Sequence, residues 1–418
     1  MTTWLVSGVR TPFARVDGAL ARRGTIELSV PVAEAMGRQL GANARADLVV
    51  WGTVMQSLPV SNIAREVVID AKLDPTTPAF STVLACSTSM VAVFEAASML
   101  RPGIDLALCG GVESMSRVQI GLTQGLSDVI RRVGQARSLG ERIDRLSETR
   151  WSDVKLYVPS VKNRATGKSM GEHCEEMAKQ WNIARADQDR IALQSHQRAV
   201  KAMGAGFFDD LVIPVEGVAR DGIPRADTSA EKLATLRPAF DRANGTITAG
   251  NASPLTDGAA AIWVASDAGV SRVPSDRPRA RLVDWEMAAV DIFHEGLLMA
   301  PAYAIPRLLA RNNLTLDAID LWEIHEAFAA QVLCNVAALE SEDFMRDRAR
   351  VSARLGKFPW DRFNPNGGSV AIGHPFGATG ARLVTTCCRR MAAEGARYGL
   401  VATCAAGGIG SALVLERM

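Results

Sequence analysis

The sequence predicts an α/β protein that contains two similar halves and an insertion. Two observations predict this fold class. Short apolar strand patterns alternate with helical patterns over the first 116 residues and again over the last third of the chain, as in layered α/β folds. In both regions a reactive-looking side chain, Cys86 or His374, stands before a helix, and a glycine pair follows the next strand. This repetition indicates a duplication, with the two halves packed back to back and a cleft between them.

The elements of the two halves follow from apolar spacing and from glycine or proline breaks. In the first half, strands and helices in alternation are expected at 4–9, 26–40, 47–52, 63–71, 87–100 and 104–109. In the second half, the matching elements are expected at 319–324, 380–393 and 398–403. The predicted division is an N-terminal half of residues 1–116 plus about 240–270, an inserted loop domain of 117–240, and a C-terminal half of 271–418.

The inserted region begins with a stretch, residues 117–168, that is rich in arginine and has few acidic residues to offset this charge. Four interpretations stay open: a solvated surface, a clamp for an anionic ligand, a contact with an anionic membrane surface, and a docking face for a partner. The apolar spacing that follows predicts two helices over 170–203.

Bulk properties exclude several classes of protein. The 418 residues carry a net charge of only +2, which gives no reason to expect a nucleic-acid partner. The seven cysteines form no metal-type pair and are odd in number, which predicts reduced thiols and a cytoplasmic location. The N-terminus resembles no targeting segment, and no apolar run reaches the roughly 18 residues that a membrane-spanning helix needs.

Cys86 is the first candidate for chemistry. It ends an apolar run and precedes small polar residues and a helical pattern, so it is expected at a helix N-terminus. Unpaired amides there stabilise an anion, which favours the thiolate and makes the cysteine a better nucleophile. The alternative is a small buried hydrophobic residue, which is a common role of free cysteine.

The second candidate, His374, lies in residues 364–380, and these seventeen residues hold five glycines. Glycines let a backbone approach a ligand closely, and Pro375 holds His374 in extended geometry before the next helix. A neutral imidazole presented in this way is suited to accept a proton from Cys86 or to donate to a developing oxyanion.

Two further candidates follow predicted strands. His325 and Glu326 invite a zinc interpretation, which we reject because position 329 is alanine and no other ligands have metal spacing. Cys404 stands at a strand end before a glycine pair. A second thiol that acts as acid and base would let one cleft break and form carbon–carbon bonds.

Taken together, the motifs resemble those of the thiolase family, in family order and over nearly the whole chain. The segments that carry the resemblance are Arg10–Pro12, the Cys86 turn, Gly110–Ser116, Gly250–Ser253, Asp257–Gly258, His325–Phe328, Gly373–Pro375 and the loop at Cys404. Many thiolases have Asn where this chain has His325. In this respect the sequence is most similar to the thiolase subunit of fatty-acid β-oxidation trifunctional complexes.

The resemblance implies a role for each candidate. Cys86 would accept the acyl group after activation by His374, and Cys404 would be the acid and base. His374 and His325 would form one oxyanion hole, with His325 acting through water. The backbone amides of Cys86 and Ala406 would form a second hole, Ala406 replacing a common glycine.

The resemblance also implies the surroundings of the site. It predicts a duplicated five-layer αβαβα core with an inserted loop domain. Ser253, Met170 and Phe328 would line the channel for coenzyme A (CoA), which is a substrate, and no cofactor or metal is expected. The expected partners are CoA thioesters, other copies of the chain in a homodimer or homotetramer, and a hydratase/dehydrogenase subunit.

Other functions remain open from the sequence alone. The main alternative is a short-chain acetyl-CoA acetyltransferase. A decarboxylating β-ketoacyl synthase would not need Cys404, and a cysteine hydrolase would need neither Cys404 nor the duplication. A non-catalytic scaffold or lipid-carrier subunit would not need to keep both thiols and both histidines.

Overall fold

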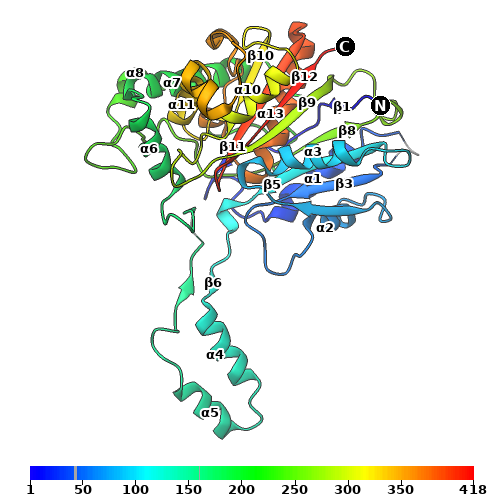
Figure 1. The fold of residues 1–418 in the computed structure, drawn as a ribbon. Helices are drawn as coiled ribbons and strands as arrows, with labels where there is room; N and C mark the ends of the chain where they lie inside the picture. Colours follow the sequence, from blue (N-terminus) through cyan, green and yellow to red (C-terminus); the bar gives the residue numbers. More distant parts are fainter. Residues whose placement is uncertain (42–44, 160) are drawn as a thin grey trace.

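The structure, a computed structural model, describes residues 1–41, 45–159 and 161–418, and its largest element is a twisted sheet (Figure 1). Within these residues ten strands belong to that sheet, in the order β10-β11-β12-β9-β1-β8-β5-β3-β4 with β2 paired to β8. The strands are β1 (Trp4–Val6), β2 (Ala14–Arg15), β3 (Leu48–Gly52), β4 (Ala79–Thr82), β5 (Leu106–Glu113), β8 (Thr256–Ala265), β9 (Arg279–Ala289), β10 (Leu321–Ile324), β11 (Tyr398–Ala405) and β12 (Ile409–Glu416).

Strand β1 joins the two halves. It pairs antiparallel with β8 of the first half on one side and antiparallel with β9 of the second half on the other. Trp4, for example, stands opposite Ala265 and Arg281. The strands of both halves are therefore hydrogen-bonded into one continuous sheet.

The helices form layers on both sides of these strands. They are α1 (Thr25–Gly37), α2 (Ile63–Asp70), α3 (Thr88–Met99), α6 (Met170–Gln180), α7 (Arg185–Gly204), α8 (Ala230–Ala234), α9 (Asp267–Val270), α10 (Pro301–Arg311), α11 (Ala329–Leu339), α12 (Ser369–Ile372) and α13 (Thr379–Glu394). One buried cluster unites α3 and α13 with strands of both halves. Two further clusters place α1 and α2 on the strands of the first half, and α10 and α11 on those of the second. These five layers confirm the predicted fold class.

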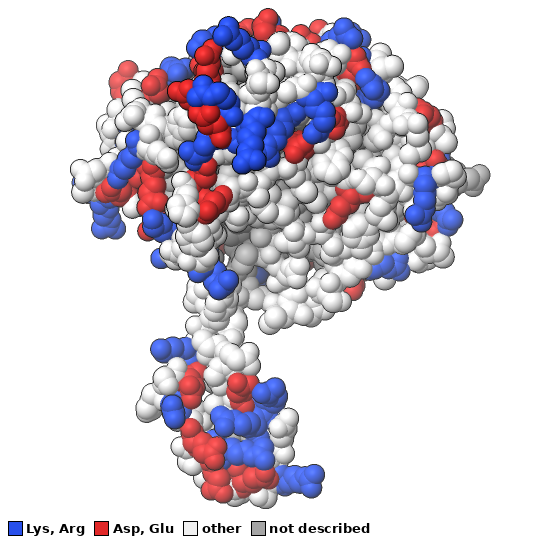
Figure 2. Space-filling model, in the orientation of Figure 1, with Lys and Arg blue, Asp and Glu red and all other residues white. Residues whose placement is uncertain are grey.

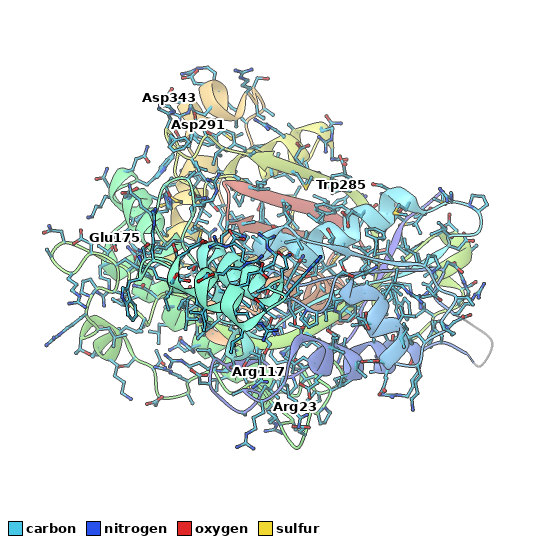
Figure 3. The ribbon with its side chains drawn as sticks, turned by 90° about the horizontal axis from the view of Figure 1, so that it is seen from below. Arg23, Arg117, Glu175, Trp285, Asp291 and Asp343 are labelled. Atoms are coloured by element: carbon cyan, nitrogen blue, oxygen red, sulfur yellow. The ribbon has the colours of Figure 1, made fainter. Side chains whose placement is uncertain are left out.

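The two central helices approach each other closely near their N-termini. A Cβ atom on Gly380 would lie 2.3 Å from the backbone nitrogen of Met90, so only glycine fits at this crossing. The ring of Phe94 on α3 also stacks on Trp285 of β9, with ring centroids 4.5 Å apart (Trp285 is labelled in Figure 3). The helix that follows Cys86 and the helix that follows His374 are thus held in fixed relative positions.

We expect Gly380→Ala to lower the free energy of unfolding by about 1–3 kcal/mol, because the added methyl group must push α3 and α13 apart. Denaturant unfolding measures the change. Gly204→Ala is the matched control, since Gly204 also lies in a helix but a Cβ there would meet nothing within 4 Å. Equal effects of the two substitutions would contradict the close crossing.

Some predicted boundaries were wrong. Strand β5 does not end at the glycine pair but runs through it to Glu113. The glycines are needed inside the strand, because a Cβ on Gly110 would lie 2.4 Å from the ring of Trp51 and one on Gly111 would lie 2.1 Å from the carbonyl oxygen of Gly377. β1 ends at Val6, whereas β11 continues past Thr403 and includes Cys404.

The inserted region has two parts. Helices α6 and α7 confirm the two helices predicted over 170–203, and they lie on the body of the protein. Residues 118–159, here called the excursion, contain β6 (Gly121–Leu122), α4 (Gln124–Gly134), α5 (Leu139–Ser147) and β7 (Leu156–Tyr157), and they project away from the body (Figure 1). The excursion leaves the body after Arg117, which is labelled in Figure 3.

The excursion is less basic than the arginine count suggests. Three arginines form ion pairs: Arg131 with Asp128, Arg132 with Glu148, and Arg145 with Glu141. Figure 2 accordingly shows acidic and basic side chains intermixed on it. Pairs at helical spacing account for two of the three. The excess of basic residues over 117–168 remains as predicted, since this stretch holds eleven basic and five acidic residues.

Candidate active site

Cys86 lies in a tight turn between β4 and α3. The turn, Ala85–Ser87, is a short 3-10 helix, and α3 begins at Thr88 as predicted. Ala85 has φ of +44°, a left-handed conformation that non-glycine residues rarely adopt. The hydroxyl of Thr88 donates to the carbonyl of Ala85 and accepts from the amide of Leu84, which fixes the turn. This strained turn holds Cys86, which keeps partial access to solvent.

Burial outweighs the helix N-terminus in setting the charge of Cys86. Desolvation raises the pKa of the Cys86 thiol to about 12, although the backbone amides of Ala406 and Cys86 act in the opposite direction. The expectation that the helix terminus makes Cys86 a thiolate was therefore wrong for the free protein. The two amides nevertheless point at the sulfur, so an anion that forms beside it meets two donors.

His374 is held by the glycine-rich segment. It follows Gly373, whose φ is +109°, and its backbone amide donates to Thr256. Its Nδ1 lies 2.6 Å from Oγ1 of Thr379, and that hydroxyl donates its proton to the carbonyl of Pro375. Thr379 must then accept a proton from Nδ1, which leaves the lone pair of His374 on Nε2.

His374 is neutral in this environment. Burial, with the charge of Arg382 acting in the same direction, lowers the pKa of His374 to about 3. Its Nε2 atom is buried and has no hydrogen-bond partner among the described residues. A neutral imidazole with a free lone pair is what a general base requires.

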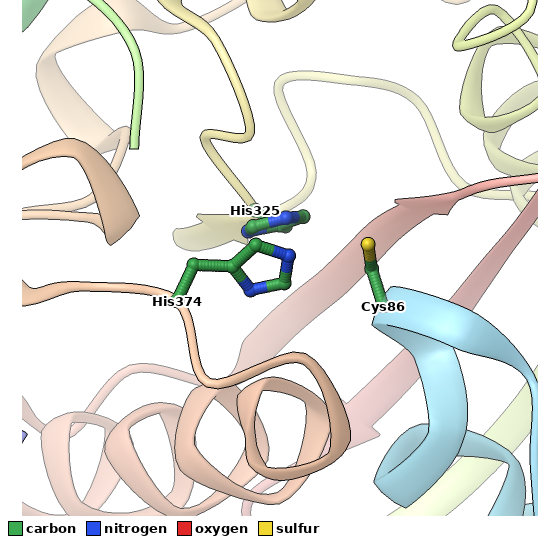
Figure 4. A group of neighbouring side chains, drawn as sticks. All are labelled: Cys86, His325 and His374. Carbon is green, nitrogen blue, oxygen red and sulfur yellow. The ribbon is translucent and has the colours of Figure 1, made fainter. Parts of the chain in front are cut away.

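His325 lies beside His374, in the loop after β10. Its amide donates to the carbonyl of Ala402, and its ring centroid is 4.0 Å from that of His374. Ligand atoms of Cys86, His325 and His374 all lie within 4.8 Å of one another (Figure 4). Burial, with the charges of His374 and Arg382, lowers the pKa of His325 well below its usual value.

This cluster bears on the zinc question. The three side chains come from three distant segments, so the spacing argument used against a metal could not have detected them. They offer one sulfur and two nitrogens, a donor set that zinc accepts. The absence of a metal therefore stays a prediction, and the spacing of residues in the sequence no longer supports it.

Cys404 brings a second thiol to the same place from the other half of the chain. It is buried near the end of β11. Burial and the proximity of Cys86 both raise the pKa of the Cys404 thiol well above its usual value. The two thiols, predicted from separate motifs, are therefore neighbours and neutral.

The residues expected to line the channel are brought together only in part. Ser253 donates through its hydroxyl to the carbonyl of Ala327, and the neighbouring Ala252 forms a bridge with Phe328. Leu255 in the same segment forms a bridge with His374, so Ser253 and Phe328 lie near the cluster. Met170 begins α6 and packs, partly buried, against the core cluster that contains Phe328 and Cys404.

The sequence did not reveal how the loop after β10 is held. The buried carboxylate of Glu326 accepts from Asn364 and Ser195, both at 2.7 Å, and from the amide of Val370. It thereby fixes this loop to the glycine-rich segment and to α7. The position of Glu326 next to His325 in one motif was the available indication. The partners of Glu326 are too distant in sequence to be predicted.

The pKa directions predict how Cys86 reacts in the free protein. With the Cys86 pKa raised to about 12 and the His374 pKa lowered to about 3, both groups are neutral between pH 5 and 9. We expect the rate of alkylation by iodoacetamide to rise continuously to high pH, since each pH unit below the pKa reduces the thiolate about tenfold. Mass spectrometry of the Cys86 peptide measures this rate. A plateau below pH 7 would instead show a thiolate–imidazolium pair.

Comparison with known proteins agrees with this architecture. The family model described as thiolase, N-terminal domain, matches residues 3–268, and that described as thiolase, C-terminal domain, matches residues 276–417. The chain belongs to the thiolase family, whose members are acyltransferases.

Individual relatives are similar over the full length. The chain is 37% identical to a 3-ketoacyl-CoA thiolase of Yersinia enterocolitica over 420 aligned residues, covering 99% of this chain and 96% of the relative. A 3-ketoacyl-CoA thiolase of Yersinia pestis gives the same identity and coverage. Among solved structures, an acetyl-CoA acetyltransferase of Bacillus anthracis superposes with a TM-score of 0.80 at 31% identity, covering 100% of this chain and 99% of the other.

Proposed function

We propose that this protein cleaves 3-ketoacyl-CoA with CoA, giving acetyl-CoA and a shortened acyl-CoA, in fatty-acid β-oxidation. The observation that carries the proposal is the pairing of two neutral thiols, Cys86 and Cys404, beside a buried imidazole with a free lone pair. The names of the full-length Yersinia relatives support the substrate class.

In the first half-reaction, Nε2 of His374 takes the proton of Cys86 as the sulfur attacks the keto carbonyl. The bond between C2 and C3 of the substrate then breaks and leaves an acyl group on Cys86. The thiol of Cys404 protonates the departing acetyl-CoA enolate and becomes a thiolate. In the second half-reaction this thiolate takes the proton of incoming CoA, whose sulfur attacks the acyl group, and His374 returns its proton to Cys86.

Two groups of donors stabilise the oxyanions in this proposal. The amides of Cys86 and Ala406, which already point at the sulfur, serve the oxygen of the acyl group on Cys86. His325, through water, and His374, once it is protonated, serve the other oxygen. Ser253, Met170 and Phe328 line the channel for CoA, and the chemistry needs no cofactor or metal.

A second candidate function is a short-chain acetyl-CoA acetyltransferase that makes or cleaves acetoacetyl-CoA, which the name of the Bacillus anthracis structure favours. CoA-dependent cleavage of 3-ketoacyl-CoA esters from four to sixteen carbons distinguishes the two. Activity that rises with chain length supports the degradative thiolase. Activity confined to acetoacetyl-CoA supports the second candidate, and no activity at any length contradicts both.

The proposal extends to partners and location. The chain would form a homodimer or homotetramer and associate with a hydratase/dehydrogenase subunit; co-purification without such a subunit at near-native expression would count against this. All seven cysteines are free, which supports a cytoplasmic location. No helix in the described part of the chain is both long and apolar enough to cross a bilayer.

The excursion would contact a membrane surface. It exposes large apolar side chains, including Trp151 at 91% exposure and Leu139 at 74%. Flotation with vesicles of phosphatidylcholine and phosphatidylserine tests this contact. Trp151→Glu should reduce flotation without lowering the cleavage rate, and flotation unchanged by this substitution would contradict the contact.

A further inference from the structure

A chain of buried polar side chains leads away from Nδ1 of His325. Nδ1 of His325 lies 2.8 Å from Oγ of Ser369, the first residue of α12. Nη2 of Arg382, on α13, donates to the same oxygen at 2.6 Å. All three side chains are at least 99% buried. Of these three residues, only His325 has been given a role so far; Ser369 and Arg382 have none.

The direction of each hydrogen bond in this chain follows from chemistry. A guanidinium group can only donate, and although burial lowers the pKa of Arg382 to about 10, it stays protonated near neutral pH. One lone pair of the Ser369 oxygen is therefore occupied by Arg382. Among the described residues, the only other hydrogen-bond neighbour of this oxygen is Nδ1 of His325. The hydroxyl of Ser369 is therefore left to donate its proton to the lone pair of Nδ1 of His325.

The consequence is a defined tautomer. An imidazole that accepts at Nδ1 carries its proton on Nε2 when it is neutral, and the pKa of His325 is lowered well below its usual value. Nε2 of His325 is buried without a partner among the described residues. Because Ser369 occupies Nδ1, we infer that Nε2 is the nitrogen free to face Cys86 and His374. His374 has the opposite arrangement, because Thr379 accepts its Nδ1 proton. One ring is therefore a donor and its neighbour an acceptor toward the same space.

We propose that Arg382, acting through Ser369, holds His325 in the Nε2-protonated tautomer, so that His325 donates a hydrogen bond toward the oxyanion while His374 remains the base. This inference rests on the proposed function. Ser369 and Arg382 are positioning residues, since neither touches the reacting atoms. The network thereby gives the two histidines different tautomers, although both rings are neutral, buried and adjacent.

Arg382 suits this task for a second reason. Its Nε and Nη1 atoms have no hydrogen-bond partner among the described residues, and the buried Glu323 also has none. A buried cation that satisfies so few of its donors is costly to the fold. The charge of the buried Glu323 favours the protonated form of Arg382, and the hydrogen bond that its Nη2 donates goes to Ser369, so the cation is kept beside the serine.

The first test reads the tautomers directly. The chain has only five histidines, so ¹⁵N-histidine labelling with His325→Asn and His374→Asn spectra assigns both rings. In the wild-type protein we expect the proton of His325 on Nε2 and that of His374 on Nδ1. In Ser369→Ala we expect the His325 signals to shift toward a mixture of tautomers, while those of His374 stay unchanged. A His325 that carries its proton on Nδ1 in the wild-type protein would overturn the inference.

The second test is kinetic. For Ser369→Ala and Arg382→Met we expect kcat for cleavage to fall about 10²-fold with little change in KM, as when one oxyanion donor is lost. Arg382→Lys should retain more activity than Arg382→Met, because Arg382 uses a single donor that lysine also offers. In Ser369→Ala, alkylation of Cys86 by iodoacetamide forms no oxyanion and should stay at the wild-type rate, which also reports that the site is folded.

The matched control is Thr386→Ala, which removes a buried hydroxyl from α13, the helix that carries Arg382. Thr386 donates to the carbonyl of Arg382 and contacts neither histidine by hydrogen bond. It should keep kcat within about twofold of wild type. If Ser369→Ala also stays within twofold while the wild-type protein is active, the positioning role is wrong and the proposed function stands. If the wild-type protein cleaves no ketoacyl-CoA yet shows the expected tautomers, the function is wrong and the tautomer assignment stands.

Discussion

Replacing Cys86 with alanine is expected to lower the rate of 3-ketoacyl-CoA cleavage by about 10⁴-fold or more, because no other group can take the acyl chain. The turn that holds Cys86 is fixed by Thr88 and not by the thiol, so the fold should survive. Steady-state kinetics measure the loss. Mass spectrometry after incubation with acetyl-CoA should show acylation of the wild-type protein and none of the variant.

Binding and folding must be shown to be intact in that variant. Calorimetric titration with CoA should give a dissociation constant close to that of the wild-type protein. Cys109→Ala is the matched control, since Cys109 is a buried thiol on β5 whose sulfur, within the described part of the chain, hydrogen-bonds only to the carbonyl of Ala92. Cys109→Ala should remain active. Turnover that persists in Cys86→Ala would show that the nucleophile lies elsewhere.

Replacing Cys404 with alanine is expected to separate the two halves of the chemistry. Acyl transfer from acetyl-CoA to Cys86 expels CoA as a thiolate, which can leave without protonation by Cys404, so the acylated protein should still accumulate. Cleavage and condensation need a group that protonates and deprotonates carbon and CoA, and these rates should fall about 10³-fold. Intact-protein mass spectrometry and steady-state rates measure the two effects on one sample.

Cys387→Ala supplies the comparison for Cys404, because Cys387 is a fully buried thiol in the middle of α13. It should leave the rates close to those of the wild-type protein. A Cys404→Ala variant that still cleaves the carbon–carbon bond at the wild-type rate would refute the acid and base role. Loss of acylation as well would assign Cys404 to activation of Cys86 instead.

Much of the fold could be predicted from local patterns. Alternating strands and helices, repeated around Cys86 and His374, predicted the duplicated layered core, and a 3.6-residue spacing located α6 and α7. Resemblance of whole motifs then predicted which side chains would share one site, and the structure brings Cys86, His325 and His374 within 4.8 Å. The roles of these residues stay predictions until the variants are measured.

What could not be predicted depends on pairs of residues far apart in sequence. The glycines at 110 and 111 suggested a strand end, but they serve close approaches to Trp51 and Gly377 within a longer strand. The charge of Cys86 could not be read from its place at a helix terminus, because desolvation outweighs the backbone amides. No local sequence pattern indicates the proposed role of Arg382, because that role depends on its contact with Ser369.

The place of β1 in the sheet has a consequence for synthesis of the chain on the ribosome. Residues 4–6 leave the ribosome long before their partners, which lie in β8 and in β9, and β9 ends at Ala289. At typical elongation rates β1 waits about 15–60 s for its second neighbour. During that time its edges are open to pairing with other nascent chains. Production of the full-length protein should therefore depend on chaperones that bind early, and slow translation before residue 289 should increase aggregation.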